Sequence, residues 1–319
     1  MINMRYARQI IFDKIGKKGQ QAIRNTTAVI VGIGAIGSTT ANLLARAGVK
    51  KLVLIDRDIV ELTNLQRQML FTEEDINKPK VIAVQEHLKK INSKVEIEAY
   101  FDNLDYTNIN LVKSDIILDC TDNLETRFLI NEYAVKNKIP WIYSAVIGSS
   151  GYVFNTLPDR PCFRCVVKEC KSLETCETTG VLNTIVNVIS ALQVNEALKI
   201  ILRKDYEKKL LFFNIWDNTL IKTNVKKDKK CPACNQKFAY LTGEAKQDIV
   251  KFCGSGTFML TGDFDFNEIK NRLKKLGKIS DWEASFNFGS LTVFKSGKVL
   301  IKAKDEKEAK SIYSRYIGN

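Results

Sequence analysis

The 319-residue chain lacks several features that would point to particular functions. It has one histidine, His87, in a polar stretch with a helical pattern, so imidazole catalysis has little support and we expect His87 on the surface. No uninterrupted apolar run approaches the length needed to cross a bilayer, and the first residues lack the apolar core of a signal peptide. We therefore expect a cytoplasmic protein that acts neither in nor on a membrane.

The chain also lacks a concentrated basic region, although it carries an excess of positive charge. There are 49 Lys and Arg residues against 36 Asp and Glu, a formal net charge of +13. The basic residues are spread along the chain rather than gathered into an arm or an aromatic-rich stripe, which argues against a nucleic-acid partner. The excess predicts a general attraction for anions, including nucleotides and acidic protein partners.

Residues 29–37 are the stretch with the clearest functional pattern. Apolar residues 28–31 run into Gly32-x-Gly34-x-x-Gly37, and a helical pattern follows over residues 38–47. In such a strand–turn–helix, the glycines permit a tight turn, close approach of a phosphate and close helix packing, and the helix N-terminus binds the anion. A second apolar strand ends in Asp56, 19 positions after Gly37, where an acid can hold a ribose hydroxyl. The pattern predicts a nucleotide site but not which nucleotide.

Strand and helix patterns alternate over the first 150 residues. This order predicts a Rossmann-like, doubly wound, mainly parallel α/β sheet with helices on both faces. Ligands of such sheets bind beyond the carboxyl ends of the strands, where the glycine turn, Asp56 and Asp122 are expected. A long connection after the second strand, residues 59–77, is more typical of a functional loop than of a passive one. The expected strands are 51–56, 95–99, 114–120, 141–146 and 152–155, and the expected helices are 79–91 and 127–137.

A change of pattern after Gly243 predicts a second domain. We expect a nucleotide-binding domain over residues 1–243, which includes a long helix at 181–202, and a small α/β appendage over residues 244–319. In the appendage, Asp305 followed by Glu308 resembles a capping box. The appendage elements expected are strands 258–260, 291–294 and 298–301 and helices 266–276 and 305–316.

Two of the cysteine motifs predict a metal site. Cys162-x-x-Cys165 and Cys231-x-x-Cys234 can each grip one ion from a tight turn, and four thiolates complete the tetrahedral shell that suits structural Zn²⁺. Such a site would join two segments that are 65 residues apart. Two redox pairs or four unliganded thiols remain the alternatives.

Several single polar residues suggest a triphosphate site when they are taken together. Arg5, Arg8, Arg67 and Lys80 are each expected on the surface by default. With the glycine turn, Asn64 and an Asp at a strand end, they would suit a triphosphate, and Asp122 would hold the Mg²⁺ that bridges its oxygens. A nicotinamide enzyme would not need Mg²⁺ or so many cations near the phosphates.

These motifs, in this order, resemble the MoeB/ThiF/HesA group of ubiquitin-activating-type enzymes over roughly residues 4–243. The resemblance implies a homodimeric adenylyltransferase that uses Mg·ATP to adenylate the C-terminal glycine of a small ubiquitin-like sulfur-carrier protein, which ends in Gly-Gly, and releases pyrophosphate. It is carried by Arg5-Tyr-Ala-Arg8, Gly32-Ile-Gly-Ala-Ile-Gly37, Asp56-Arg-Asp58, Asn64-Leu-Gln-Arg67, Lys78-Pro-Lys80, Asp119-Cys-Thr-Asp122-Asn123 and the two cysteine pairs.

The resemblance also implies roles for individual positions. Asp56 would bind the ribose, Asp122 the magnesium and the four paired cysteines zinc, while Arg8 would reach into the ATP site of the neighbouring subunit. Many members have a glycine where this chain has Ala35, but the backbone N–H that contacts phosphate is retained. The phosphates would be bound by Asn64, Arg67 and Lys80, and the motif residues Gly32, Gly34, Ala35, Gly37, Asp58 and Asn123 complete the expected nucleotide site.

Cys176 lies in a segment similar to the crossover loop of the family. Its thiol joins the activated carrier in some relatives and is dispensable in others, and both interpretations stay open. Glu174 and Glu177 would oppose thiolate formation. We expect Cys120 in the core and no role for Cys170 or Cys253.

Two other functions remain as alternatives. The glycine turn alone would also suit an NAD-dependent oxidoreductase, and the zinc motif would suit a non-catalytic scaffold that binds a ubiquitin-like partner. The carrier is open between a MoaD-like protein for molybdopterin, a ThiS-like one for thiamine and a tRNA-thiolation carrier. The appendage is too short, and lacks the cysteine loop, for a rhodanese-like sulfurtransferase domain; carrier docking and dimer or core stabilisation are both open.

Overall fold

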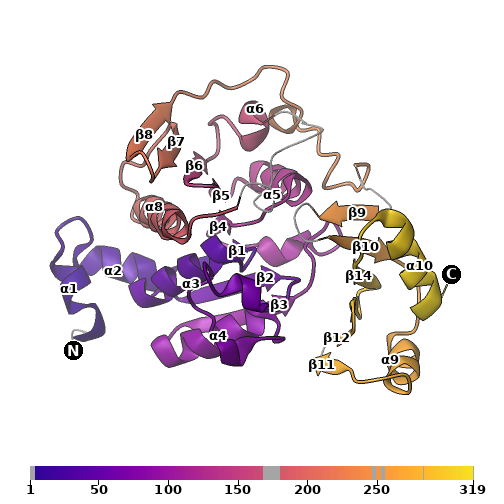
Figure 1. The fold of residues 1–319 in the computed structure, drawn as a ribbon. Coiled ribbons are helices and arrows are strands. Elements are labelled where there is room, and N and C mark those ends of the chain that lie inside the picture. Colours follow the sequence, from indigo (N-terminus) through magenta and orange to yellow (C-terminus); the bar gives the residue numbers. More distant parts are fainter. Residues whose placement is uncertain (1–3, 168–179, 246–248, 253–255, 283, 319) are drawn as a thin grey trace. The chain divides into compact units, whose positions relative to one another are not determined.

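The computed structural model describes residues 4–167, 180–245, 249–252, 256–282 and 284–318. The chain folds as two compact units, Met1–Glu244 and Ala245–Asn319 (Figure 1).

The first unit is built on an eight-stranded sheet with the order β3-β2-β1-β4-β5-β6-β7-β8. The five strands from β3 to β5 pair in parallel, and β6, β7 and β8 continue the sheet antiparallel. The expected doubly wound, mainly parallel sheet is therefore confirmed. Its strands are β1 (Thr27–Val31), β2 (Lys51–Asp56), β3 (Glu96–Phe101), β4 (Ile116–Asp119), β5 (Trp141–Ile147), β6 (Ser150–Thr156), β7 (Leu210–Asn214) and β8 (Thr219–Thr223).

Helices cover both faces of the parallel part of this sheet. Along β1, Val29 and Val31 join a cluster with Phe128 of α5, while the alternating Ala28 and Ile30 are also fully buried. This period-two burial on both faces explains the continuous apolar run at this strand. The helices are α1 (Ala7–Ile11), α2 (Gly16–Asn25), α3 (Ala35–Ala47), α4 (Lys80–Ile91), α5 (Leu124–Asn137), α6 (Phe163–Val166) and α8 (Asn183–Ile201), with short 3₁₀ turns η1 (Met4–Tyr6), η2 (Leu62–Asn64), η3 (Glu73–Asp75), η4 (Ile109–Val112) and η5 (Ala233–Asn235).

Helix α8 is a core helix of the first unit. It packs against α3 and strands β5 and β6, with Ile185, Val186 and Ile189 buried. Among the described helices, α8 is the one that is long and apolar enough to cross a bilayer by length and composition. This is weak evidence for a membrane span, because the core helices of water-exposed folds pass the same test. On its buried face, Gln193 donates to the backbone oxygens of Asp119 and Ile142, which ties α8 to the sheet.

The sequence patterns missed strands β7 and β8. Every residue of β8 is exposed, so this edge strand has no alternation of buried and exposed positions to reveal it. The expectation for His87 was also incomplete, because its Nε2 lies 2.6 Å from the buried carboxylate of Asp75. Asp75 caps η3 within the connection that follows β2, so His87 fastens that connection to α4.

The second unit is a six-stranded antiparallel sheet with the order β11-β12-β13-β14-β10-β9 and two helices. Its core joins Phe258, Phe286 and Val299 with Ile269 and Ala309 of the helices. Three short strands, β9, β11 and β12, were missed because runs of three or four residues show little periodicity. The elements are β9 (Ile249–Phe252), β10 (Thr257–Thr261), α9 (Phe266–Lys274), β11 (Ser280–Trp282), β12 (Ser285–Phe288), β13 (Leu291–Phe294), β14 (Lys298–Lys302) and α10 (Glu306–Tyr316).

The start of α10 differs in detail from a capping box. Asp305 accepts a hydrogen bond from the backbone N–H of Glu308, as expected. The Glu308 carboxylate, however, accepts from the N–H of Lys304 rather than from that of Asp305. The helix start is still held from both sides.

Candidate functional site

The glycine turn after β1 opens into α3 at the edge of the sheet where the parallel strands end. Gly32 has φ +84°, and a Cβ on it would lie 2.7 Å from the backbone oxygen of Cys120. A Cβ on Gly37 would overlap the backbone oxygen of Gly32, whereas no atom of the described residues lies within 4 Å of a Cβ on Gly34. Two glycines are thus required by the turn itself, and no described residue packs against the third. In the described part of the chain no side chain caps the start of α3, so its first N–H groups can receive an anion.

Asp56, at the end of β2, supports this turn. Its carboxylate accepts hydrogen bonds from the N–H of Ile33 at 2.5 Å and of Asp58 at 2.7 Å. Burial and the neighbouring Asp58 carboxylate raise the pKa of Asp56, while Lys80 opposes the shift. The turn, the ribose-binding candidate and the segment after β2 therefore form one connected unit.

Lys80 begins α4 and is buried beside acidic groups. Its Nζ lies 3.0 Å from the carboxylate oxygen Oδ2 of Asp58, and the backbone N–H of Lys80 donates to the backbone oxygen of Asp58. Burial opposes the charge, but the nearby carboxylates of Asp58, Asp56 and Asp122 together raise the pKa of Lys80. The ammonium is therefore held charged at the edge of the sheet.

Arg57 connects the segment after β2 to the segment after β4. Its guanidinium lies 3.9 Å from Asp122 Oδ1 and 3.9 Å from Asp58 Oδ1, and it donates to Asn103. Arg57 belongs to the Asp56-Arg-Asp58 motif, which by itself predicts no role for it. A signal was available, since Arg57 sits between two of the expected site residues.

Asn64 and Arg67 lie on the connection between β2 and α4. Asn64 is buried, and its Oδ1 accepts from the N–H of Glu61 in a capping box that fixes η2. Arg67 donates from Nη1 to the Thr63 oxygen at 3.0 Å. Asn64 ends η2 and Arg67 lies in the turn that follows it, and neither side chain forms a hydrogen bond or ion pair with Lys80 or Asp122.

Asp119 and Arg127 fix the conformation of the turn that carries Asp122. The sequence patterns did not predict either of them as a site residue. Asp119 Oδ1 accepts from the N–H and hydroxyl of Thr121, and its Oδ2 lies 3.6 Å from Arg127 Nε. Arg127 also donates to the Thr121 oxygen. Burial raises the pKa of Asp119 to about 6. The carboxylate of Asp122 is left largely exposed, 66 %, at the tip of this turn.

Asn123 and Cys120 flank Asp122 and have structural contacts. Asn123 caps α5, because its Oδ1 accepts from the N–H of Thr126. Cys120 lies behind the glycine turn with its thiol toward Gln193, and burial raises the pKa of the thiol to about 12. The thiol is therefore protonated near neutral pH, and the residue is half-buried rather than fully in the core as expected.

Some expected site residues are not brought to this edge. Arg8 lies on α1, is exposed, and has no recorded side-chain partner among the described residues. Cys176, Cys170 and Cys253 lie outside the described residues.

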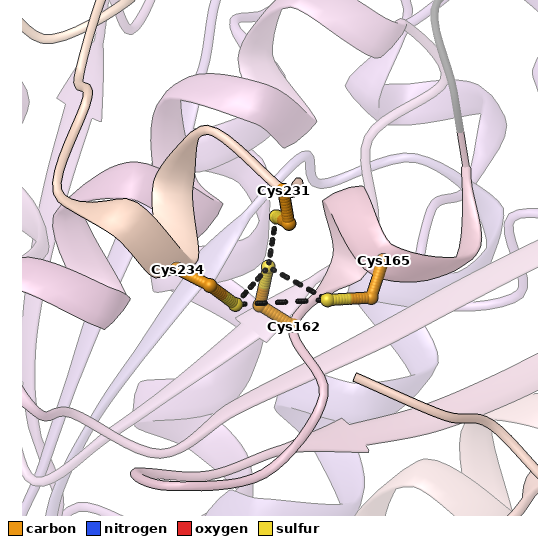
Figure 2. Close-up of side chains that lie close together, drawn as sticks. All are labelled: Cys162, Cys165, Cys231 and Cys234. Carbon is orange, nitrogen blue, oxygen red and sulfur yellow. Dashed lines mark hydrogen bonds between the residues drawn. The ribbon is translucent and has the colours of Figure 1, made fainter. Parts of the chain in front are cut away.

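The two cysteine pairs converge in a single cluster. All four Sγ atoms lie within 4.8 Å of one another, with neighbouring distances of 3.5 to 3.9 Å (Figure 2). A tetrahedral ion with metal–sulfur distances of about 2.3 Å separates its ligands by about 3.8 Å. None of the four is in a disulfide. The cluster, formed by Cys162, Cys165, Cys231 and Cys234, thus has the geometry to hold one metal ion.

Groups around the cluster fix its orientation. Asn131 of α5 donates to Cys162 Sγ at 3.6 Å and accepts from the N–H of Phe163. The buried carboxylate of Glu132 pairs with Arg164, between the first two cysteines, and accepts from the N–H groups of Tyr240 and Leu241. Both cysteine segments are therefore fastened to α5.

The chain matches known proteins over nearly its whole length. The family model described as "ThiF family" matches residues 6–235. The chain is 34 % identical over 333 residues to the sulfur carrier protein ThiS adenylyltransferase of Bacillus subtilis, covering 98 % of this chain and 99 % of that protein. It is 33 % identical to the SAMP-activating enzyme E1 of Haloferax volcanii, over 73 % of this chain and 88 % of that one.

A solved structure has a similar fold. E. coli MccB, crystallised with MccA-N7isoASN, superimposes with a TM-score of 0.66 at 25 % identity and covers 73 % of this chain and 75 % of its own. The match agrees with the doubly wound first unit.

Proposed function

Because this chain belongs to the ThiF family, we propose that it is an ATP-dependent adenylyltransferase that activates the C-terminal glycine of a small ubiquitin-like sulfur-carrier protein as acyl-AMP and releases pyrophosphate. The observation that carries the proposal is the 34 % identity to a ThiS adenylyltransferase over 98 % of the chain. The open glycine turn, with a cation and carboxylates gathered at the same edge, supplies the chemistry that the reaction needs.

The roles of the site residues follow from this proposal. The N–H groups after Gly34 and the side chains of Asn64, Arg67 and Lys80 would bind the phosphates, and Asp56 would bind the ribose. Adenylation requires in-line placement of the carrier carboxylate against the α-phosphate and neutralisation of the charge that passes to pyrophosphate. It requires no general base, which suits a chain with one histidine.

Asp122 is the proposed magnesium ligand. Its carboxylate is exposed at the tip of a turn that Asp119 and Arg127 hold, and carboxylate oxygen is a preferred ligand of this hard cation. Magnesium at this position would neutralise charge on the phosphates. Asp58 would keep Lys80 in place until the nucleotide binds, since its Oδ2 lies 3.0 Å from Nζ.

We assign the four-cysteine cluster to structural zinc. The sulfur separations and the all-thiolate donor set suit this ion, and the donor set leaves no position open for a substrate. The metal would join the segment after β6 to the segment after β8.

A second copy of the chain is expected to complete the site. Arg8 has no recorded side-chain partner among the described residues, and the adjacent Ile11 and Phe12 are 73 % and 52 % exposed. An apolar pair beside an arginine would suit contact with a neighbouring subunit, and the proposal therefore includes a homodimer. The described cysteines are all free of disulfides, which supports placing the reaction in the reducing cytoplasm.

We assign adenylation to residues 1–243 and leave residues 244–319 without an assigned role. The ThiF match ends at residue 235, inside the first unit.

The test is formation of a carrier adenylate. Purified protein with Mg·ATP and each candidate carrier should yield, by intact mass spectrometry, a carrier bearing AMP, and a carrier that lacks its last glycine should not react. A carrier with its terminal Gly-Gly intact that stays unmodified in every pairing would contradict the proposal.

A further inference from the structure

A cavity outside the nucleotide-site residues lies at the end of α8. A cavity of about 450 Å³ is formed by the C-terminal end of α8, the loop that follows it, the residues after β8 and Arg160. The volume is in the range of small-molecule sites. All of its lining residues belong to the first unit.

The position of this cavity separates it from the nucleotide site. Ser190, in the middle of α8, donates to the backbone oxygen of Ile36 at the start of α3. Lys199, which lines the cavity, lies nine residues further along α8, about 14 Å along the helix axis. Arg160 follows the end of β6, where Thr156 pairs with Trp141 at the beginning of β5, so the cavity lies at the opposite edge of the sheet from Asp56 and Asp122.

Four side chains of the cavity offer hydrogen-bond donors without a recorded partner in the described part of the chain. They are Arg160, Tyr206, Lys209 and Asn224. Two of the four are permanently or normally cationic, and the other two are neutral donors. This set matches the several oxygen acceptors of a small multivalent anion.

The remaining charges of the cavity are already compensated. Lys199 is paired with buried Glu196 at 2.5 Å, and Lys208 lies 3.5 Å from Asp205. Glu207 binds Lys222 at 2.8 Å and accepts from the N–H groups of Lys208 and Lys209. The positive charges left for a ligand are those of Arg160 and Lys209.

The wall of the cavity is fixed by buried groups. The Glu196 carboxylate accepts from the N–H of Glu207 at 2.7 Å, and Asn155, also buried, donates to the Glu207 oxygen at 2.8 Å. The last carbonyls of α8, which would repel an anion, are partly satisfied by N–H groups of Leu202, Arg203 and Lys204. The loop is thus held in place before any ligand arrives.

We propose that this cavity is a second anion site that binds a small phosphate-bearing molecule through Arg160 and Lys209, with Tyr206 and Asn224 as neutral donors. The shared ligand chemistry is the phosphate group, which inorganic phosphate, pyrophosphate and phosphorylated metabolites all supply. The inference does not rest on the proposed adenylation reaction.

The test is calorimetric titration of the full-length protein with pyrophosphate and with inorganic phosphate, at fixed ionic strength. A non-hydrolysable ATP analogue with Mg²⁺ is present at saturating concentration to cover the nucleotide site. We expect binding that weakens about tenfold, equivalent to about 1.4 kcal/mol, in Arg160→Gln and again in Lys209→Gln. Tighter binding of pyrophosphate than of phosphate would identify a multivalent ligand, and equal binding a single phosphate group.

Lys204→Gln is the matched control, because Lys204 is an exposed neighbour with the same charge that does not line the cavity. It should bind like the wild type. Binding unaffected by both cavity substitutions, or weakened equally by Lys204→Gln, would overturn the proposal. So would a wild-type protein that binds neither anion. A failure of adenylation would appear instead as absence of carrier adenylate, with anion binding unchanged.

Discussion

At the scale of single residues, the glycines of the nucleotide turn have different tasks. Gly32 and Gly37 are required because backbone passes close to both, whereas no described residue packs against Gly34 or caps the start of α3 beside it. Gly32 and Gly37 are therefore expected to matter for folding stability, and Gly34 for nucleotide binding. A substitution series can separate the two.

We expect Gly37→Ala to destabilise the protein by about 1–3 kcal/mol, the usual cost of overpacking, because the new Cβ would meet the Gly32 oxygen. Gly34→Ala should change stability by less than about 1 kcal/mol yet weaken ATP binding, since its methyl group occupies the space left for phosphate. Denaturant unfolding and nucleotide titration measure the two effects. The interpretation fails if Gly34→Ala binds ATP normally.

The side chains that meet the phosphates and magnesium should affect turnover without affecting the fold. Removal of Arg67 or Asp122 by alanine should lower pyrophosphate exchange on the order of 10²–10³-fold, by analogy with loss of one preorganised electrostatic group. The melting temperature should change little, because Asp122 is largely exposed and Arg67 makes one recorded hydrogen bond. The exposed Asp13→Ala and Arg24→Ala are matched controls. Near-normal exchange in either site variant would refute its assignment.

Asp119 should make stability depend on pH. Its pKa is about 6 in the folded protein against about 3.9 in an unfolded chain, so the folded state binds the proton more tightly. Stability from this group is therefore greatest below pH 4 and falls as pH rises from about 4 to about 6, by on the order of 2–3 kcal/mol. Unfolding of wild type and Asp119→Asn across this range should show the wild type losing stability relative to the variant. A constant difference between the two would contradict this role.

Asp75 should make stability depend on pH in the opposite direction. Burial alone would raise the pKa of Asp75, but hydrogen bonds from Thr72 and His87 outweigh it and lower the pKa. The wild type should therefore lose stability relative to Asp75→Asn as the pH falls below about 4.

At the scale of structural elements, the cysteine cluster joins α6 and η5, and α5 supports both. The intervening chain is long, so a metal that holds its ends restricts the unfolded state much as a disulfide would. Glu132 and Asn131 add contacts that persist without metal.

Removal of zinc should therefore destabilise the first unit without unfolding its parallel sheet. Cys231→Ala should contain no zinc by elemental analysis, while wild type contains one ion per chain. A loss on the order of 3 kcal/mol, by the disulfide analogy, corresponds to a melting temperature lower by roughly 6–12 °C. Cys120→Ala is the matched control, because this cysteine is outside the cluster and should leave zinc content unchanged. A stoichiometric metal in Cys231→Ala would contradict the assignment.

The elements that the sequence predicted well are those with strong periodicity. Strand β13 has the predicted bounds, and α4 and α8 differ by one or two residues at their ends. Strand β8 escaped detection because burial does not mark an exposed edge. The candidate site shows the same limit. Local motifs predicted Asp56, Lys80 and Asp122 as site residues, whereas the links through Arg57 and Arg127 depend on distances between segments that no local pattern contains.

At the scale of the whole molecule, each of the two units has a hydrophobic core of its own, and the proposed site residues lie in the first unit. The match to the Bacillus subtilis adenylyltransferase nevertheless extends over 98 % of the chain. The second unit is therefore a shared feature of the two proteins and not an addition peculiar to this one.

We expect a chain truncated after Glu244 to retain pyrophosphate exchange within about tenfold of the full-length rate, because it keeps every proposed phosphate, magnesium and zinc residue. Carrier affinity, measured by calorimetry on both proteins, decides whether the second unit contributes to docking. A truncated protein that folds by circular dichroism yet has lost exchange at saturating carrier would show that the first unit is not sufficient.

The most direct measurement of adenylation is ATP–pyrophosphate exchange by the full-length protein, with and without each candidate carrier. We expect exchange that requires Mg²⁺, appears with a carrier ending in Gly-Gly and disappears when its last glycine is removed. Absence of exchange with every carrier, together with tight binding of NAD, would contradict the assignment and favour an oxidoreductase.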